Sequence, residues 1–309
     1  MARDKDGTHP LLDERTPRRL TLARRVSATD PRTAADFLAL YSGLSKRAVK
    51  DAMSKGAAWV TRARPGSRRT RLRRAKAPLA PGDRVELYYD PRILELEPPQ
   101  ARCIADRETY SVWFKPAGLL SEGTSYGDHV SILRQVEKAV APRRRTYLVH
   151  RLDREAQGLM VFAHTRAAAG NLSRQFQAMQ VEKVYLAEVR GDLAAAHGRT
   201  GRVELPLDGQ AALTEYEVLS YDAERDVSAV RVRIATGRLH QIRRHLDMLG
   251  FPVMGDPRYG RGNKNTEGMR LVAAGLAFRD PATGERVHFE LPEAEAGWQG
   301  TNAAEERSA

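Results

Sequence analysis

A polar segment inside an apolar stretch contains the residues best suited to chemistry. The apolar pattern at 147–162 is interrupted by five polar or charged side chains, His150, Arg151, Asp153, Arg154 and Glu155. A carboxylate set among cations between two buried strands can act as a nucleophile or as a general acid or base, because burial and neighbouring charge tune its reactivity. From these residues alone, however, a loop that stabilises itself with ion pairs is the more economical interpretation.

A second basic cluster lies at 237–246, where a strand-like run gives way to a helical pattern. Arg238, Arg243 and Arg244 lie near the start of that predicted helix. The N-terminal end of a helix carries unpaired N–H groups and a partial positive charge, so arginines there favour a carboxylate or a phosphate ligand. The alternative is ordinary surface charge.

Neither a metal nor a cofactor is expected. His240 and His245 are five residues apart, whereas helical histidines that share a metal are four apart. The single cysteine, Cys103, excludes an intramolecular disulfide and a cysteine zinc site, and we expect it to pack in the interior.

The positive charge is concentrated towards the N-terminus. The chain has a net charge of +12, and residues 1–90 hold 21 Lys or Arg against 10 Asp or Glu, so the remainder is close to neutral. Such an asymmetry indicates a basic module that recruits a polyanion, RNA or DNA, to a near-neutral partner domain. A solvated basic surface is the alternative.

Short elements can be predicted in this basic region. A helix is expected over 45–56, a strand over 57–60 and an alternating strand over 84–89. Eight cations and no acidic residue lie at 62–76, interrupted by a Pro-Gly turn, which indicates a basic hairpin.

This helix, strand and basic hairpin resemble the small RNA-binding module first seen in a ribosomal small-subunit protein. The resemblance implies that the helix and the hairpin bind RNA phosphates. The side chains expected to contact RNA are Lys46, Arg47, Arg68, Arg69, Arg73 and Arg74.

Beyond residue 90 the pattern becomes rich in strands. Apolar or alternating runs predict strands at 111–114, 159–162, 184–189 and 230–234. Two amphipathic helices are also predicted, with apolar faces formed by Leu172, Phe176 and Met179 in one and by Ile242, Leu246 and Leu249 in the other. Because regular strand–helix–strand units are few, an α+β fold with a mixed, mainly antiparallel sheet and flanking helices is favoured.

These patterns divide the chain into four parts: a flexible tail at 1–24, a basic RNA-binding domain at 25–90, a larger domain at 91–296 and a second tail at 297–309. A chain of 309 residues that is 41% hydrophobic and 29% charged is typical of globular proteins. No apolar run approaches the roughly 20 residues of a membrane span, and the N-terminus lacks a secretory signal. A cytoplasmic location is therefore expected, with no membrane partner.

Seven motifs in the larger domain occur in an order that resembles the pseudouridine synthases of the RluA type, which modify ribosomal and transfer RNA. The resemblance covers 101–292, and an N-terminal RNA-binding module is a common attachment in that family. The motifs are FKPAGL at 114–119, HRLDR at 150–154 with GL at 158–159, KVYLA at 183–187, ALTEY at 212–216, TGRLHQIRRHL at 236–246, GDPRYG at 255–260 and FELP at 289–292.

The resemblance implies a pseudouridine synthase fold and assigns roles to four residues. Asp153 matches the catalytic aspartate, which attacks either the uracil ring or the ribose carbon that bears it, so that the detached base can rotate and rejoin through carbon. Arg243 matches the arginine that keeps this carboxylate ionised, and Tyr185 the tyrosine that packs on the base and helps to remove the final proton. Arg151 matches the arginine that fills the RNA stack when the uridine flips out.

Other matched residues are given supporting or RNA-binding roles. Arg154 and Arg238 are expected to contact RNA, whereas His150, His240 and Gln241 are expected to be structural.

A neighbouring motif is also expected to be structural. Lys115, Pro116 and Gly118 are predicted to shape the loop beside the site.

The chain departs from the family pattern in the loops around the site. Ala156 and Gln157 stand where Thr-Ser is usual, Leu239 replaces a Thr, and a segment that contains Ser121 replaces a Val-His-Pro-like one. These changes are expected to affect the choice of substrate.

Two further functions fit the same residues. One is a non-catalytic RNA-binding or ribosome-assembly factor on the same scaffold, although Asp153, Tyr185 and Arg243 are all intact. The other is a glycosidic hydrolase, which needs a second carboxylate for which Glu155 is a poor candidate. The expected partner is RNA, ribosomal rather than transfer RNA, and the protein is expected to be a monomer.

Overall fold

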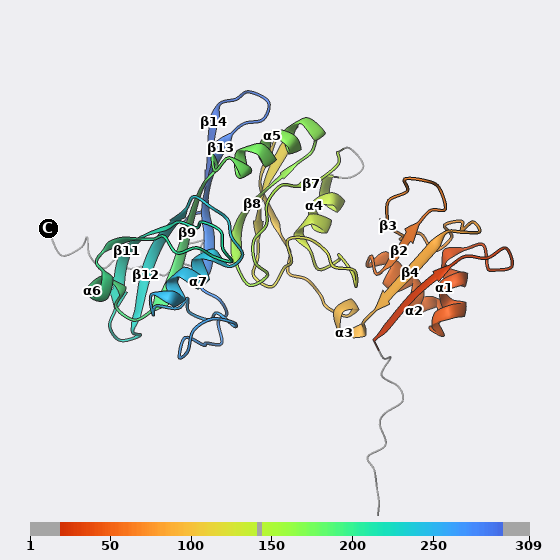
Figure 1. Cartoon of the computed structure of the whole chain (residues 1–309), viewed down its shortest axis with the longest axis horizontal. Coiled ribbons are helices and arrows are strands. Elements are labelled where there is room, and N and C mark those ends of the chain that lie inside the picture. Colours follow the sequence, from red (N-terminus) through yellow and green to blue (C-terminus); the bar gives the residue numbers. More distant parts are fainter. Residues whose placement is uncertain (1–18, 141–143, 293–309) are drawn as a thin grey trace, which may run out of the picture. The chain divides into compact units, whose positions relative to one another are not determined.

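The computed structural model describes residues 19–140 and 144–292, and these form two compact units (Figure 1). The first unit contains residues up to Glu97 together with Thr124–His129, and the second contains Pro98–Gly123 and the chain from Val130 onward. Residues 1–18 of the predicted N-terminal tail and all of the predicted C-terminal tail lie outside the described residues. The domain boundary that the sequence predicts after residue 90 lies between Asp90, the N-cap of the short helix α3, and the helix itself (Pro91–Leu94).

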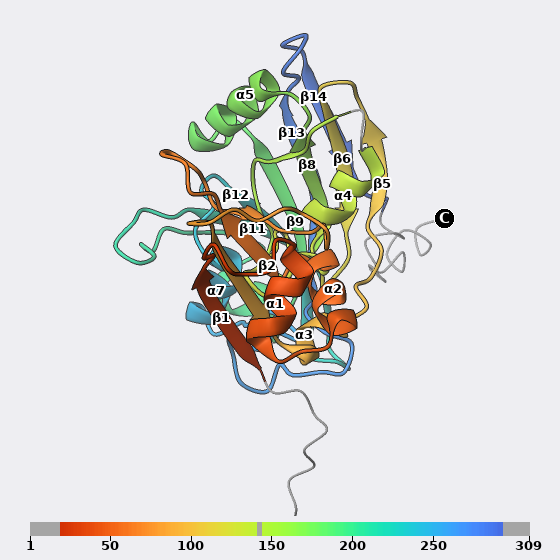
Figure 2. The same ribbon diagram turned by 90° about the vertical axis from the view of Figure 1, so that its right-hand side faces the viewer.

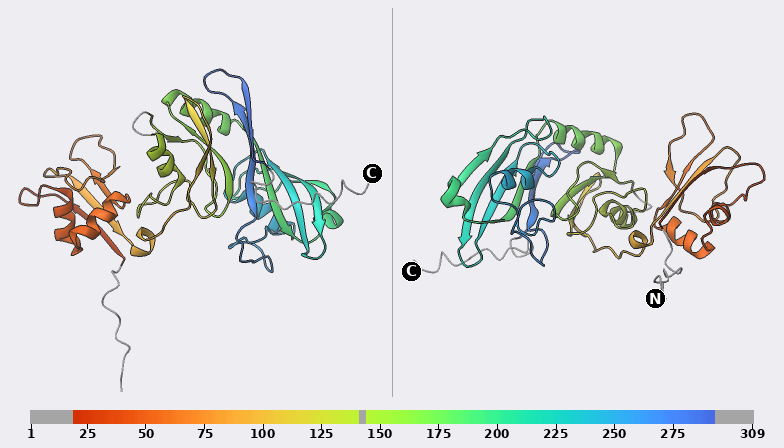
Figure 3. Two further views of the ribbon diagram at one scale, coloured as in Figure 1. Left: turned by 180° about the vertical axis from the view of Figure 1, so that it is seen from behind. Right: turned by 60° about the horizontal axis from the view of Figure 1, so that its bottom comes forward.

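The first unit is a four-stranded antiparallel sheet in the order β1-β4-β2-β3, with two helices on one face (Figures 2 and 3). Apolar side chains from the helices and the sheet, among them Phe37, Leu38, Met53 and Leu87, are buried between them. The elements are β1 (Leu20–Arg25), α1 (Ala34–Ser42), α2 (Lys46–Ser54), β2 (Ala58–Thr61), β3 (Thr70–Arg71) and β4 (Arg84–Tyr89).

The predicted helix and strands of this unit are present. Ser45 begins α2, because its Oγ accepts the Ala48 N–H at 3.2 Å, and β2 and β3 pair as the expected hairpin. The prediction of a flexible tail to residue 24 is wrong for its last part, since Leu20–Arg25 forms β1 and pairs with β4 along its length. Leu20 and Leu22 pack against the core from this edge strand.

The second unit is built on a ten-stranded sheet whose main path is β10-β11-β12-β9-β13-β8-β6-β5 (Figure 1). All neighbours pair antiparallel except β8 and β13, which confirms the predicted mixed α+β fold. The strands are β5 (Arg102–Asp106), β6 (Tyr110–Lys115), β7 (Tyr147–Leu148), β8 (Gln157–Ala163), β9 (Glu182–Arg190), β10 (Thr200–Val203), β11 (Thr214–Asp222), β12 (Val227–Ile234), β13 (Leu271–Arg279) and β14 (Arg286–Glu290); the helices are α4 (Ile132–Val140), α5 (Arg166–Gln177), α6 (Leu193–His197) and α7 (Gln241–Met248).

Two side-chain placements differ from the predictions. Met179 was expected on the apolar face of a helix, but α5 ends at Gln177, and Met179 follows it with φ +57° and is 54% exposed. Cys103 was expected to be buried but is exposed on β5. None of the helices in the described ranges is both long and apolar enough to cross a bilayer.

The start of β8 pairs with β13 in the middle of the sheet. Gly158 in β8 lies so close to β13 that a Cβ atom there would be 2.3 Å from the Ala273 carbonyl oxygen, and its φ is +122°. Only glycine permits this approach. The loop at 149–156, which precedes β8, is thereby fixed against the middle of the sheet, next to β9 and the start of α7.

Candidate active site

The loop that carries Asp153 is held by two buried side chains from the segment 115–121. The Ser121 Oγ donates to the Leu152 carbonyl at 2.7 Å and accepts the Leu152 N–H at 2.9 Å. The Lys115 Nζ, which is fully buried, donates to the carbonyls of Leu119 and Arg154 at 2.8 and 3.2 Å. The backbone of both neighbours of Asp153, Leu152 and Arg154, is therefore held by hydrogen bonds.

Burial strongly affects the Lys115 ammonium. It lowers the pKa of Lys115 to about 7, an effect that the nearby Glu155 and Asp153 carboxylates only partly oppose. The Lys115 side chain connects the carbonyls of two loops by hydrogen bonds, which agrees with the structural role expected for it.

Asp153 and Arg243 form an ion pair, with Asp153 Oδ2 and Arg243 Nη1 2.8 Å apart. The Arg243 side chain is 2% exposed and the Asp153 side chain 21%. A second carboxylate, Asp256, accepts from Arg243 Nε and Nη2 at 2.7 and 2.8 Å. The guanidinium thus bridges a partly buried and a fully buried carboxylate.

The charge of Arg243 is secured by these partners. Burial opposes the charged form, but the hydrogen bonds to Asp256 and Asp153 outweigh it and raise the pKa of Arg243 above its ordinary value. Burial likewise opposes ionisation of Asp256, yet Arg243 and the N–H groups of Tyr259 and Arg258 hold the pKa of Asp256 below its usual range.

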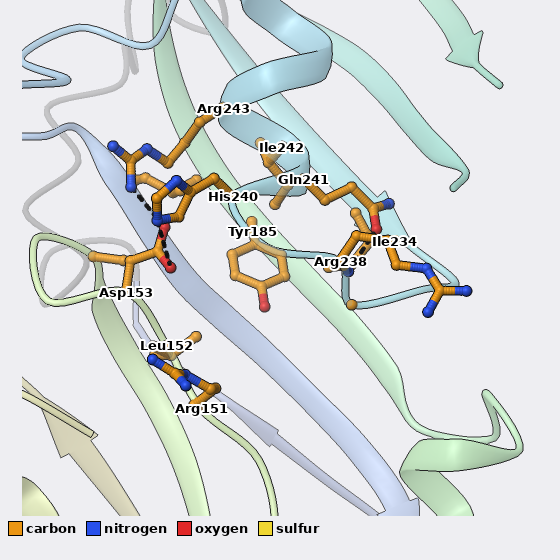
Figure 4. Close-up of a pocket in the computed structure, with 13 residues that line it drawn as sticks. Arg151, Leu152, Asp153, Tyr185, Ile234, Arg238, His240, Gln241, Ile242 and Arg243 are labelled. Carbon is orange, nitrogen blue, oxygen red and sulfur yellow. Dashed lines mark hydrogen bonds and ion pairs between the residues drawn. The ribbon is translucent and has the colours of Figure 1, made fainter. Parts of the chain in front are cut away.

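His240 also approaches the Asp153 carboxylate (Figure 4). Its Nε2 is 3.7 Å from Asp153 Oδ1, and its Nδ1 is 3.0 Å from the Tyr259 hydroxyl. Burial lowers the pKa of His240, although the Asp153 charge opposes this effect, so the ring is neutral at neutral pH. His240 caps α7 with φ +53°, a left-handed conformation that is unusual for a side chain with a Cβ atom.

Tyr185 projects from β9 into the same pocket that Asp153 and Arg243 line (Figure 4). Burial, assisted by the Asp153 charge, raises the pKa of Tyr185 above its ordinary value. The phenol therefore stays protonated at neutral pH, which favours a packing role over the removal of a proton.

The pocket is open and brings most of the expected site residues together. Besides Asp153, Tyr185 and Arg243, it is lined by Arg151 and Arg238. The Arg151 side chain is 69% exposed, and the Arg238 Nε donates to the Ala211 carbonyl at 3.1 Å.

Two other arginines lie outside the pocket lining. Arg154 is exposed, and its Nε donates to the Gly118 carbonyl at 3.3 Å. Arg244 forms a bidentate pair with Asp208 at 2.8 and 3.1 Å, so its charge is already matched.

Two supporting residues, Gln241 and His150, have the expected structural contacts. Gln241 receives the Thr236 hydroxyl and the Arg238 N–H on its Oε1, while its Nε2 donates to the Leu213 carbonyl at 2.7 Å. The His150 Nε2 accepts the Val161 N–H at 3.0 Å.

Ala156, one of the departures from the family pattern, is buried and lines the pocket, whereas Leu239 is 59% exposed. Asp256 and Ser121 were not identified as site residues from the sequence. Asp256 is the acidic residue of the GDPRYG motif, and its place in that motif is the one feature of the sequence that marks it as a candidate site residue.

The cations expected to contact RNA in the first unit fall into two groups. Arg69 pairs with Glu86 at 2.7 Å and lies over the Trp59 ring, and Arg73 pairs with Asp128. These two arginines hold the unit together.

The other four are on the surface. Lys46 pairs with Asp36 at 2.7 Å, but both side chains are largely exposed. Arg47, Arg68 and Arg74 are exposed and form no ion pair with any residue that the structure describes.

Comparison with known proteins places these features in context. Residues 109–248 match the family model described as RNA pseudouridylate synthase. An uncharacterized RNA pseudouridine synthase of Aquifex aeolicus (strain VF5) is 32% identical over 289 residues, which cover 84% of this chain and 89% of the relative. The dual-specificity RNA pseudouridine synthase RluA of Escherichia coli (strain K12) is 34% identical over 196 residues, which cover 58% of this chain and 86% of the relative.

Solved structures are similar as well. Human RNA Pseudouridylate Synthase Domain Containing 1 superposes with a TM-score of 0.52 at 25% identity, over 64% of this chain and 86% of that one.

Proposed function

Because the chain belongs to the RNA pseudouridylate synthase family, whose members isomerise uridine in RNA, we propose that Asp153 is its nucleophile and that the target uridine flips out of the RNA to reach it. One observation carries the proposal. Asp153 lines the pocket, and its Oδ2 is bound by Arg243, whereas its Oδ1 accepts no hydrogen bond from the described residues and has the neutral His240 ring 3.7 Å away. A carboxylate with one oxygen held and the other free is oriented for attack.

The reaction needs no atom from outside the substrate. The Asp153 oxygen adds either to the uracil ring or to the ribose C1′, and the N1–C1′ bond breaks. The detached base rotates, its C5 bonds to C1′, and the proton on C5 leaves to a base or to water, while N1, which has lost its bond to C1′, takes up a proton from water. The carboxylate is then released, so the product is an isomer of the substrate and the enzyme returns to its starting state.

Arg243 keeps a positive charge against Asp153 throughout this sequence. Its pKa is raised by its two carboxylate partners, so the Asp153 oxygens face a cation at every working pH. The pairing lowers the cost of an ionised carboxylate in a partly buried site.

Tyr185 and Arg151 are proposed to handle the base. The protonated Tyr185 ring offers a flat surface beside Asp153 on which uracil can pack. Arg151 is exposed at the rim of the pocket, where it can enter the gap that the flipped nucleotide leaves. Flipping costs a few kcal/mol, so a group that fills the gap helps to stabilise the open RNA.

The first unit is proposed to bind RNA in the manner of the ribosomal-protein module that its sequence resembles. The exposed Arg47, Arg68 and Arg74, with Lys46, supply the cations. We further propose ribosomal RNA rather than transfer RNA as the target, and a monomer in the cytoplasm as the working form.

Release of the C5 hydrogen tests the function. Purified protein is incubated with in vitro transcribed ribosomal or transfer RNA that carries tritium at C5 of uridine. Isomerisation predicts tritium in water and pseudouridine at defined positions, with no free uracil. Free uracil would show glycosidic hydrolysis instead, and tight RNA binding with no tritium release from any RNA would support the non-catalytic alternative.

A further inference from the structure

A second hollow adjoins the active-site pocket, and most of the residues that line it take part in none of the steps above. It has a volume of about 440 Å³, within the range of sites that bind small ligands. Arg151, Tyr185 and Arg238 line both hollows, so the two are continuous along one wall. A ligand that fills the first can extend into the second without leaving the surface.

A pair of stacked rings forms part of its lining. The rings of His150 and Phe176 lie 4.5 Å apart with an interplanar angle of 18°. His150 Nε2 accepts the Val161 N–H, so the proton of the neutral ring is on Nδ1. Burial, together with the charge of Lys183, lowers the pKa of His150 to about 3, so the ring stays uncharged.

A lysine without a counter-ion completes the lining. Lys183 Nζ donates to the carbonyls of Thr236 and Ala235 at 3.1 and 3.4 Å, and no carboxylate of the described residues lies within ion-pair distance of it. Burial lowers the pKa of Lys183 to about 8, because its charge is not compensated. The lining contains three cations, with Arg151 and Arg238, and no acidic residue.

We infer that this hollow binds the nucleotide next to the target uridine in the same RNA strand, with its base on the outer face of the Phe176–His150 stack and its phosphate beside the Lys183 ammonium. The inference rests on the proposed function, which places uridine in the adjoining pocket. A flat aromatic surface next to uncompensated positive charge is the chemistry that single-stranded RNA selects, since stacking accepts any base and the cation meets the backbone. Exposed Met179 extends the apolar part of this lining.

Small probes can test the inference in the full-length chain that carries Asp153→Asn, which prevents turnover. Uridine and the dinucleoside monophosphates UpA and ApU are titrated and their dissociation constants compared. One dinucleotide is expected to bind about fivefold or more tightly than uridine, the lower end of what stacking one base contributes. The same dinucleotide with an abasic second residue should lose most of this advantage.

Substitutions in the protein test which residues cause the tighter binding of the dinucleotide. Lys183→Gln and Phe176→Ala should each reduce the dinucleotide advantage, and Lys183→Arg should restore it, while uridine affinity changes less than about twofold. Arg233→Gln is the matched control for loss of a cation, because Arg233 is exposed on β12 and lines neither hollow. It should leave the advantage intact.

The outcomes separate the two proposals. Equal affinity for uridine and both dinucleotides, or an advantage that survives the abasic probe and both variants, would overturn the subsite. Uridine binding that does not respond to Tyr185→Ala would instead count against the proposed function.

Discussion

Asp256 binds the Nε and Nη2 atoms of Arg243 at 2.7 and 2.8 Å, which leaves only Nη1 to face Asp153. Asp256 is fully buried and touches neither the pocket nor the reacting atoms. It is therefore a positioning residue, and Arg243 transmits its effect to the site.

Replacing Asp256 should displace Arg243 from its position against Asp153. In Asp256→Asn the amide cannot accept both N–H groups of Arg243, so the guanidinium shifts, and a displacement near 1 Å can reduce a rate by about 100-fold. We expect kcat to fall by about that factor while RNA affinity changes little, as measured by single-turnover kinetics and filter binding. A fall in affinity alone, with kcat intact, would contradict the positioning role.

The Ser121 hydroxyl should matter in a similar way. Ser121→Ala leaves the N–H and carbonyl of buried Leu152 without their partner, which costs about 1–3 kcal/mol of stability. The loop that carries Asp153 should become less rigid. The kcat should therefore fall even at temperatures at which the variant remains folded. Ser173→Ala on α5, where the serine forms no hydrogen bond in the structure described, should change neither.

The protonated state of Tyr185 gives a direct test of its role. Since burial keeps the phenol protonated, Tyr185→Phe should retain activity within about tenfold, whereas Tyr185→Ala should lose at least about 100-fold. Loss of activity in the Phe variant as severe as in the Ala variant would show that the hydroxyl takes part in the removal of the proton.

His150 predicts a pH dependence of stability. Its folded pKa of about 3 lies below the ordinary 6.5, so between these values the unfolded chain binds a proton that the folded chain does not. Stability should therefore fall as the pH falls from 6.5 towards 3. His150→Gln, which retains an acceptor for the Val161 N–H, should show a smaller difference between urea midpoints at pH 7 and pH 4.5 than the unmodified chain.

The basic unit should respond differently to two pairs of substitutions. Arg68→Gln with Arg74→Gln removes exposed cations, so the dependence of log Kd on log salt should become less steep by about two for two phosphate contacts. Arg69→Gln with Arg73→Gln should lower the melting temperature of the unit instead, because those arginines pair with Glu86 and Asp128. An unchanged salt slope in the first pair would count against RNA binding by this surface.

The sequence predicts four of the ten strands of the larger unit, β6, β8, β9 and β12, because their apolar runs are a local pattern. The pairing of Asp153 with Arg243 follows from the order of the motifs that resemble the family. β1 could not be found in this way. Its residues read as part of a charged tail, and the strand forms only because β4, some 60 residues later, supplies its partner.

Pairing between residues far apart in the sequence also explains the errors at Arg73 and Asp256, whereas the error at Met179 has a local cause. Arg73 reads as a free cation, since Asp128 is 55 residues away along the chain. Met179 continues the helical spacing of Leu172 and Phe176, but α5 has already ended, and nothing in the spacing reports that end. Asp256 has no periodic or charge signal until the fold places it against Arg243.

Loss of the nucleophile provides the most direct measurement. Tritium release from C5-labelled RNA is followed in single turnover for the full-length chain, for Asp153→Asn and for Glu155→Gln, the other carboxylate of the same loop. Asp153→Asn should release no tritium above background while binding RNA normally, and Glu155→Gln should remain active within about tenfold. Release by Asp153→Asn at a rate near that of the unmodified chain would show that Asp153 does not attack the substrate.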